Sequence, residues 1–315
     1  MYEKWKGVHT RCAFNMIQEL IPLTRPRTLA AALGPTILGA AFSYYAFGAA
    51  QGTGLAIFHT VLIFLAVVTA QIVANLWNEY KDFKSGLDAG QKVGNAGSIT
   101  RGVITPELII TMIKVLMFVP IIIGLYLSAT ITWYYIPVGF LCILISFLYS
   151  GGPKPISRTP FGEISSGIAM GFAIVLITGY AWIRELSLAL LIPAIPSTLL
   201  VGSIMLTNNI RDIRNDESHG RHTLPIVLGR ERALSLMSIS YIFNFIWIIA
   251  WIIVGHMTWF TLLAFLATPL AFKTIHTLST NTDEFQLDKA MGTTAGAAMI
   301  YQLMWAVGLI MGKLI

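Results

Sequence analysis

Residues 55–78 read LAIFHTVLIFLAVVTAQIVANLWN, an apolar stretch without Asp, Glu, Lys or Arg, and residues 79–88 follow directly as EYKDFKSGLD. A helix needs about 20 mostly apolar residues to cross a bilayer, so the first stretch predicts a membrane-spanning helix. The charged continuation places acids and lysines where that helix leaves the membrane. This one junction therefore predicts both a membrane protein and a polar site at the membrane surface.

The composition of the whole chain agrees with this prediction. Of the 315 residues, 56% are hydrophobic and 11% are charged, whereas globular domains have roughly a quarter charged residues. We predict an all-α membrane protein with nine transmembrane helices, because nine apolar segments recur along the chain. These segments are 28–50, 55–78, 107–128, 131–150, 162–183, 187–209, 232–254, 258–277 and 290–312.

The basic residues predict how these helices are oriented in the cell membrane. With a cytoplasmic N-terminus, eighteen Lys and Arg residues fall in inner segments, and only Arg184 and Lys313 fall in outer ones. Cytoplasmic loops of membrane proteins carry such an excess. We therefore expect a multi-pass protein whose N-terminus and long polar loops are cytoplasmic and whose C-terminus is outside. The net charge of +6 is accounted for by this asymmetry, and no nucleic-acid partner is predicted.

Residues 1–27 are predicted to be a cytoplasmic tail rather than a signal peptide, because charged residues interrupt its apolar stretches. Apolar residues recur in this tail at near-helical spacing, which predicts a short helix lying in the membrane interface. The residues concerned are Phe14, Ile17, Leu20 and Ile21.

We predict that residues 28–315 form one transmembrane domain with an internal repeat. The second apolar segment ends in Asn78, with Asp82 four residues later, and the sixth ends near Asn208, with Asp212 at the same spacing. An even number of crossings separates the two, so both ends face the same side of the membrane. The pattern predicts two repeats of four helices and an added ninth helix.

Oxygen-bearing side chains share one helical face in each of these two stretches. Residues three or four apart, and seven or eight apart, lie on the same side of an α-helix. Mg²⁺ prefers hard oxygen ligands and commonly shares them with substrate phosphates. The two faces therefore predict a pair of Mg²⁺ sites that bridge a diphosphate, although isolated acids at helix ends are usually only solvated caps. The first face holds Asn75, Asn78 and Asp82, and the second holds Asn208, Asp212 and Asp216.

Basic and aromatic side chains on the same side of the membrane are candidates for substrate binding. Lys154 lies in a Gly-Gly-Pro-Lys-Pro loop whose restricted backbone would hold its ammonium group in place, and Arg101 is a second basic candidate. Aromatic rings stabilise cations, but near a membrane surface they also serve as anchors. The aromatic candidates are Trp77, Tyr80 and Tyr149.

Taken together, these motifs resemble the UbiA superfamily of intramembrane aromatic prenyltransferases, and within it the branch that prenylates 1,4-dihydroxy-2-naphthoate in menaquinone synthesis. In the general family pattern an acid directly follows the first Asn and a third Asp stands eight positions on. Here Glu79 fills the former position, Gly86 stands at the latter, and the next acid is Asp88. The motifs are RPRTL at 25–29, NEYKDFKSGLD at 78–88, YSGGPKP at 149–155, TPFGE at 159–163, NNIRDIRND at 208–216 and GRHTL at 220–224.

The resemblance implies nine helices around a central cavity that opens laterally to lipid and is capped by two cytoplasmic Asp loops. It implies that Mg²⁺ is the cofactor, that polyprenyl diphosphate ionises to an allylic cation, and that an aromatic acceptor attacks it; in the naphthoate branch CO₂ is then lost. Asp82, Asp212 and Asn78 are the implied catalytic residues. The implied metal ligands are Asp82, Asp212, Asp216, Asn78 and Asp88, and the implied substrate-binding residues are Asn75, Lys154, Arg101, Tyr149, Asn208, Trp77 and Tyr80.

Two alternatives remain open from the sequence. A related prenyltransferase acting on 4-hydroxybenzoate, homogentisate, haem or a chlorophyllide would share the metal chemistry and differ only in its acceptor pocket. A transporter would need ionisable residues near the middle of the membrane, whereas every Asp and Glu falls at or outside the end of an apolar segment. Apart from the site, Gly167 and Gly171 have the spacing that permits close packing of two helices.

Overall fold

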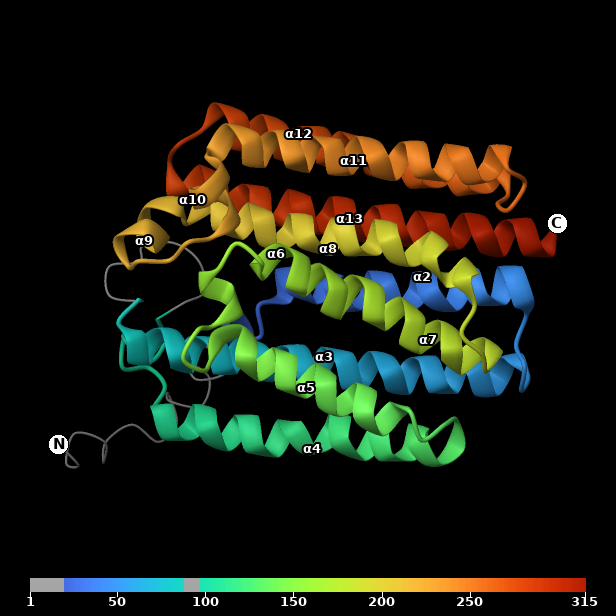
Figure 1. Cartoon of the computed structure of the whole chain (residues 1–315), viewed down its shortest axis with the longest axis horizontal. Coiled ribbons are helices and arrows are strands. Elements are labelled where there is room, and N and C mark those ends of the chain that lie inside the picture. Colours follow the sequence, from blue (N-terminus) through green and yellow to red (C-terminus); the bar gives the residue numbers. More distant parts are fainter. Residues whose placement is uncertain (1–19, 88–96) are drawn as a thin grey trace, which may run out of the picture.

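The described part of the chain is a bundle of long helices that run side by side (Figure 1). The computed structural model describes residues 20–87 and 97–315. Within these ranges every regular element is helical, as predicted. Asp88 and most of the predicted interfacial helix of the tail lie outside the described residues.

The helices follow one another in chain order as two groups joined at η5. The first group contains η2 (Pro26–Leu29), α2 (Ala30–Phe47), α3 (Thr53–Ser85), α4 (Pro106–Thr130), α5 (Tyr135–Ser150), η3 (Ile156–Arg158), α6 (Gly162–Ser166), η4 (Gly167–Phe172) and α7 (Ala173–Ile183). The second contains η5 (Leu188–Leu190), α8 (Leu191–Arg211), α9 (Ile213–Ser218), α10 (Leu224–Leu228), α11 (Arg230–Ile253), η6 (Trp259–Ala267), α12 (Thr268–Thr280) and α13 (Glu284–Leu314).

Eight helices of the described chain are long and apolar enough to cross a membrane, which makes it a multi-pass membrane protein. Each of the nine predicted segments coincides with a helical stretch, but α5 has only 16 residues. A helix of that length spans about 24 Å, which is less than the roughly 30 Å of the hydrocarbon core. By length, eight of the nine predicted spans are therefore observed as candidates, and α5 is the exception.

Two helices extend well beyond the apolar segments that predicted them. α3 continues to Ser85, so Asp82 lies in its last helical turns and not in a loop, which corrects the prediction that this motif is a capping loop. α13 begins at Glu284, six residues before the predicted start of the ninth segment. Both extensions carry polar residues that cannot lie in lipid, and both reach the same end of the bundle.

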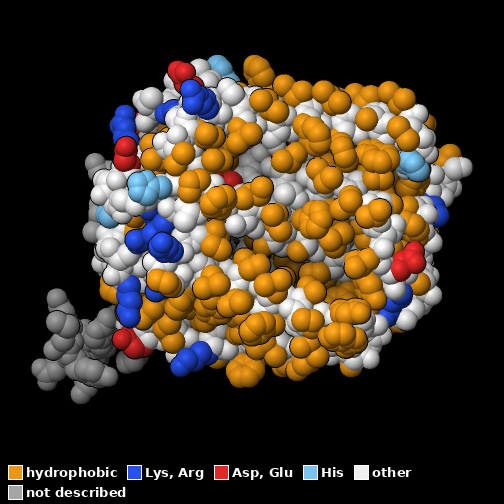
Figure 2. Space-filling view, in the orientation of Figure 1, with side chains coloured by type: hydrophobic (Ala, Val, Ile, Leu, Met, Phe, Trp, Pro, Cys, Tyr) orange, Lys and Arg blue, Asp and Glu red, His pale blue; other side chains and the backbone are white. Residues whose placement is uncertain are grey.

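The surface divides as expected for a protein in lipid. Hydrophobic side chains cover the middle of the face shown in Figure 2, and charged side chains gather mainly at the left end, where α9 and α10 lie. On α4, Phe118 and Ile122 are 63% and 62% exposed. Such exposure costs roughly 25 cal/mol per Å² of apolar surface in water, but it costs nothing against lipid tails.

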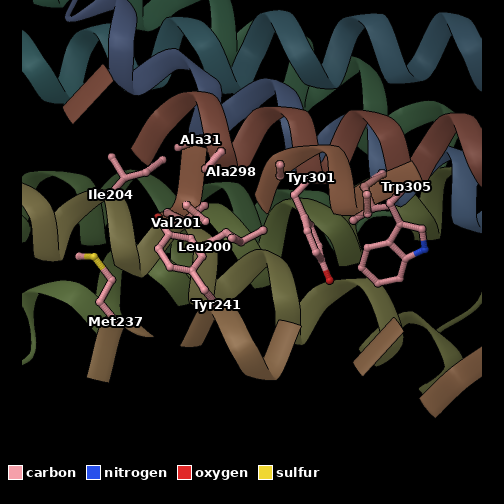
Figure 3. Close-up of a cluster of buried hydrophobic side chains, with 14 of the residues drawn as sticks. Ala31, Leu200, Val201, Ile204, Met237, Tyr241, Ala298, Tyr301 and Trp305 are labelled. Carbon is pink, nitrogen blue, oxygen red and sulfur yellow. The ribbon is translucent and has the colours of Figure 1, made fainter. Parts of the chain in front are cut away.

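The main hydrophobic core lies between α2, α8, α11 and α13. Figure 3 shows Leu200 and Val201 of α8 pointing towards side chains of α11 and α13. Trp305 of α13 is fully buried, and its Nε1 donates to Met257 Sδ over 3.2 Å. The hydroxyl of Tyr301 donates to the backbone carbonyl of Asn244 over 2.5 Å. In a membrane interior each such polar group needs a partner inside the protein.

Gly167 and Gly171 allow one helix to pack directly on the backbone of another. A Cβ at Gly167 would lie 2.5 Å from the carbonyl oxygen of Thr198, and one at Gly171 would lie 2.5 Å from that of Ser197. The predicted close packing is confirmed. The same stretch, η4, is a π-helix, a form that is rare and is frequently found at functional sites.

Candidate active site

Two helix ends meet at the end of the bundle where charged side chains gather. Gly86 takes a left-handed conformation (φ 73°) as the C-cap of α3, which glycine adopts without strain. α8 stops at Arg211, and Asp212 (φ −94°, ψ 7°) forms the break before α9. The predicted oxygen-bearing faces of α3 and of α8 with α9 therefore lie beside one space.

That space is a polar cavity of about 720 Å³, which we call the mouth cavity. Five predicted residues line it, together with four arginines and a further aspartate that were not predicted as site residues. The lining is Arg25, Arg27, Thr28, Asn78, Asp82, Leu87, Asn208, Arg211, Asp212, Asn215, Asp216, Arg221, Asp288 and Met291.

Arg221 connects the two predicted acidic motifs. Its Nη2 donates to Asp82 Oδ1 over 2.9 Å, and its Nη1 lies 3.3 Å from Asp216 Oδ1. The side chains of Arg221, Asp82 and Asp216 are 12%, 13% and 3% exposed. A guanidinium between two poorly hydrated carboxylates offsets their mutual repulsion, so this pairing holds α3 and α9 together over the cavity.

Arg211 makes a second arginine-centred cluster. Its Nε and Nη2 each donate over 2.7 Å to the two carboxylate oxygens of Asp212. Its Nη1 donates to Asp288 Oδ1 over 2.8 Å, and its Nη2 also donates to Asn208 Oδ1 over 2.9 Å. Arg27 approaches from the other side and donates to Asp288 Oδ2 over 2.7 Å. This cluster joins η2, α8 and α13 at the rim of the mouth cavity.

Asn78 sits between the mouth cavity and the interior of the bundle. In the amide orientation that satisfies its neighbours, its nitrogen donates to Ser150 Oγ over 2.9 Å and to Asp82 Oδ2 over 3.2 Å. Its oxygen accepts from Arg25 Nη1 over 3.0 Å. Arg25 has a left-handed backbone (φ 50°), which is uncommon for a residue other than glycine and clusters at functional sites.

A second, mainly apolar cavity continues from the mouth cavity into the bundle, and we call it the central cavity. It has about 1420 Å³ of empty space and is lined by α3, α5, α6, η4, α7 and α8. Arg25, Asn78, Asn208 and Arg221 line both cavities. Apolar and small polar side chains make up most of the rest, among them Val67, Ala70, Ala74, Cys142, Ile145, Ser146, Ala169, Met170, Ile174, Ile177, Val201, Ile204 and Met205.

Burial raises the pKa of Asp216 to about 7, well above the usual value for Asp. The Arg221 guanidinium opposes this rise, and the nearby charges of Asp212 and Asp82 add to it. Its Oδ2 is buried and accepts no hydrogen bond from the described residues. The Oδ2 atom of Asp216 is therefore available to bind a proton or a metal cation near neutral pH.

The residues of the mouth cavity have the chemistry to bind Mg²⁺, but their oxygen atoms do not converge on a single position. Within the described ranges, no group of three or more His, Cys, Asp or Glu side chains is placed to hold a metal. The carboxylates instead form two pairs, each bridged by an arginine. Carboxylates and amide oxygens are the hard donors that Mg²⁺ prefers, and substrate phosphates commonly complete its shell. The site therefore suits Mg²⁺ that binds together with a diphosphate.

Of the other predicted residues, some line a cavity and others do not. Asn75 and Tyr149 line the central cavity. Lys154 and Arg101 are exposed and line neither cavity, because the loop of Lys154 points its side chain outwards and Arg101 instead donates to Ser98 Oγ. Asp88 lies outside the described residues.

Trp77 and Tyr80 are not brought into the site. Trp77 Nε1 donates to the carbonyl of Phe147 over 3.0 Å, and its ring stacks on that of Tyr80. Successive helix residues turn by about 100°, so Trp77 is turned by about 100° from Asn78, and Tyr80 by about 160°. The two rings line neither the mouth cavity nor the central cavity, and their role in substrate binding stays a prediction.

Sequence reasoning missed several charged residues of the site. Arg25 and Arg27 lie in a motif that was recognised but given no role, and Arg211 lies between two predicted residues. Arg158 lines a neighbouring cavity with Asp82 and Arg221. Nothing in the sequence near Asp288 marks it, because its partners are supplied by helices remote in the chain. Helix periodicity predicts which residues share one face of a helix, but it does not predict which other helices pack against that face.

Comparison with known proteins agrees with this architecture. Residues 32–306 match the model of the UbiA prenyltransferase family. A 1,4-dihydroxy-2-naphthoate octaprenyltransferase of Bacillus subtilis (strain 168) is 35% identical over 303 residues, covering 94% of this chain and 93% of that protein. A protein of the same name from Mycobacterium tuberculosis is 29% identical over 297 residues, covering 92% of this chain and 96% of that protein.

The fold is also similar to solved structures. An apo UbiA homolog from Aeropyrum pernix K1 has a TM-score of 0.68 and 17% identity, covering 90% of this chain and 97% of the other. A UbiA homolog from Archaeoglobus fulgidus, bound to GPP and Mg²⁺, has a TM-score of 0.58 and 16% identity, covering 92% of this chain and 99% of the other. Since the family model spans most of the sequence and the helices pack in the same fold, the chain belongs to the UbiA prenyltransferase family.

Proposed function

We propose that this protein transfers a polyprenyl group from polyprenyl diphosphate to 1,4-dihydroxy-2-naphthoate, releasing diphosphate and CO₂ and giving demethylmenaquinone. The observation that carries the proposal is the junction of the two cavities: a mouth cavity lined by arginines and aspartates opens directly into an apolar cavity of about 1420 Å³. A molecule with a charged head and a long apolar tail fits this arrangement. The acceptor is chosen on the full-length similarity to naphthoate octaprenyltransferases.

The mouth cavity would bind the diphosphate. Asp82, Asp212 and Asp216, with Asn78, are the residues that would hold Mg²⁺; when bound, the metal would neutralise the charge of the departing diphosphate. Asn208, which accepts from Arg211 at the rim, lies within reach of the same group. The arginines of the cavity supply planar, permanently charged groups that suit phosphate oxygens.

The central cavity would hold the reacting carbon and the acceptor ring. An allylic cation is destroyed by water, and the apolar lining of this cavity excludes water from it. Tyr149 lines the central cavity and offers an aromatic face where positive charge would develop. Asn75, which donates to the carbonyl of Thr24 over 3.0 Å, fixes the adjoining wall.

The prenyl tail would leave the central cavity between α5 and the stretch formed by α6 and η4. α5 packs on α3, α4 and η3, while its Cys142, Ile145 and Ser146 line the cavity opposite Ala169. Figure 2 shows a hollow on this face between the positions of α5 and α6. If part of the prenyl tail lies in lipid, the length of the tail is not limited by the size of the central cavity.

The nine-helix topology belongs to the same proposal. α5, the fourth apolar segment along the chain, would also cross the membrane and so bring the number of spans to nine. The excess of basic residues in the predicted inner segments supports a cytoplasmic mouth cavity, a cytoplasmic N-terminus and an outer C-terminus. Residues 28–315 would then form one prenyltransferase domain.

The test is transfer by the purified protein in lipid with carboxyl-labelled 1,4-dihydroxy-2-naphthoate, a long-chain polyprenyl diphosphate and Mg²⁺. We expect one labelled CO₂ per prenylated product, and no turnover after the metal is chelated. Turnover of 4-hydroxybenzoate with its carboxylate retained, and none of the naphthoate, would keep the family and overturn the acceptor. Absence of any prenyl transfer with a panel of aromatic acceptors would overturn the proposed function.

A further inference from the structure

Arg211 forms hydrogen bonds with the carboxylate of Asp212, which the proposed function requires as a ligand of Mg²⁺. Both oxygens of Asp212 accept from this one guanidinium, over 2.7 Å each. A divalent cation at Asp212 must displace at least one of these hydrogen bonds. The side chain of Arg211 is only 8% exposed, so a displaced guanidinium needs another partner inside the site, because a buried unpaired charge is strongly unfavourable.

Asp288 is placed to be that partner. Its Oδ1 accepts from Arg211 Nη1 over 2.8 Å, on the side of the guanidinium away from Asp212. Its Oδ2 accepts from Arg27 Nη1 over 2.7 Å, so the carboxylate is fixed from a third element. It is 19% exposed and lies in the second turn of α13. Arg211 can therefore lose its hydrogen bonds to Asp212 and still keep its ion pair with Asp288 at the rim of the cavity.

Arg221, the other arginine that bridges two carboxylates, has no described carboxylate partner apart from the proposed metal ligands. Arg221 contacts Asp82 and Asp216, and both of these are proposed metal ligands. Among the described residues that line the mouth cavity, Asp288 is the one carboxylate that holds an arginine without being a proposed metal ligand. The cavity lining contains four arginines and four aspartates, so removal of the Asp288 charge would leave an excess of positive charge beside Asp212.

We propose that Asp288 is a positioning residue of the diphosphate site: it holds Arg211 and Arg27, and it keeps Arg211 beside the incoming diphosphate when Mg²⁺ takes its place on Asp212. The proposal rests on the proposed function for the presence of Mg²⁺ and diphosphate in the mouth cavity. It gives a charged residue of the last helix, α13, a role in the diphosphate site. Asp288 touches neither the metal nor the reacting carbon.

The experiment measures Mg²⁺ binding to the purified protein by calorimetry, with and without inorganic diphosphate. In Asp288→Asn the guanidinium keeps only Asp212 as a charged partner, so we expect the Kd for Mg²⁺ to rise about tenfold and the KM for Mg²⁺ to rise with it. kcat at saturating Mg²⁺ should fall by a smaller factor than the affinity for Mg²⁺. Asp288→Glu should restore most of the affinity. The matched control is Asp283→Asn, which removes a carboxylate from the same helix start and keeps its N-cap, since Asn caps as well as Asp.

A double-mutant cycle separates this role from a merely structural one. If Asp288 acts through Arg211, then Asp288→Asn has no further effect on Mg²⁺ affinity in an Arg211→Gln protein. An equal loss in both backgrounds, or unchanged Mg²⁺ affinity in Asp288→Asn, would overturn the proposal while leaving prenyl transfer standing. Conversely, a coupled loss of Mg²⁺ affinity in a protein that prenylates no acceptor supports the role of Asp288 and overturns the proposed function.

Discussion

The guanidinium of Arg221 donates to Asp82 Oδ1 over 2.9 Å, although 139 residues separate the two in the chain. Asp82 belongs to the end of α3, and Arg221 follows α9, so this contact closes one acidic motif onto the other. The backbone of the neighbouring His222 donates to the carbonyl of Arg158 over 3.0 Å and adds the α5 to α6 connection to the same contact region. The lining of the mouth cavity comes from four separate parts of the described chain: 25–28, 78–87, 208–221 and 288–291.

Asp82→Asn and Asp212→Asn should each abolish prenyl transfer without unfolding the protein. Each change removes a charged metal ligand from a helix end and leaves the apolar bundle intact. A loss of about a thousandfold in kcat corresponds to about 4 kcal/mol of transition-state stabilisation, within the range for a lost metal contact. The measurement is turnover at saturating Mg²⁺, with the Tm as the check on folding.

The matched control for these variants is Glu217→Gln, because Glu217 is an exposed acid of α9 next to Asp216. It should keep wild-type turnover. Activity close to wild type in either aspartate variant would count against metal binding in the mouth cavity.

Mg²⁺ binding should depend on pH around neutrality because burial raises the pKa of Asp216 to about 7. Above this pKa the carboxylate is ionised and ready to bind the metal, and below it the metal must displace a proton. From pH 8 to pH 6 the ionised fraction falls about tenfold, so the affinity for Mg²⁺ alone should fall by about the same factor. Calorimetry across this range measures it, and in Asp216→Asn the pH dependence should largely disappear.

A bulky side chain at Ser146 should block the path of the prenyl tail. Ser146 lines the central cavity from α5, whereas Leu144 of the same helix is 40% exposed on the outside. We expect Ser146→Trp to lower kcat/KM for a long-chain diphosphate by about tenfold, equivalent to about 1.4 kcal/mol, and to affect a five-carbon donor much less. Leu144→Trp is the matched control and should change neither. Equal effects of the two tryptophans would place the tail elsewhere.

Single cysteines at Ser85 and Ser218 should react with an impermeant maleimide only after cell lysis, in a protein whose Cys12 and Cys142 are replaced by serine. Both serines are exposed at the mouth cavity end. A cysteine at Trp133, which is exposed in the connection between α4 and α5 at the other end of the bundle, should react in intact cells. The reverse labelling pattern would invert the proposed topology.

Helical periodicity and hydropathy were sufficient to predict much of this protein. The apolar segments located the helices because the cost of exposing backbone in lipid leaves few other structures. The three- and four-residue spacing grouped Asn78 with Asp82 correctly because it is a local property of the helix. In the second stretch Asp216 lies in α9, beyond the break at Asp212, and still lines the same cavity. Applied to Trp77 and Tyr80, the same periodicity turns both side chains away from the face that Asn78 and Asp82 share.

Other properties of the site were decided only by the tertiary structure. Asp288 lies 77 residues from Arg211 along the chain, and no local pattern records that α13 brings it to the rim. The contact of Arg25 with Asn78 and the bridge from Arg221 to Asp82 likewise arise from packing between helices distant in sequence. The sequence by itself determined which residues lie in membrane helices and which share a helical face. The packing of those helices determined which charges pair, because ion pairs depend on distance in space and not on separation along the chain.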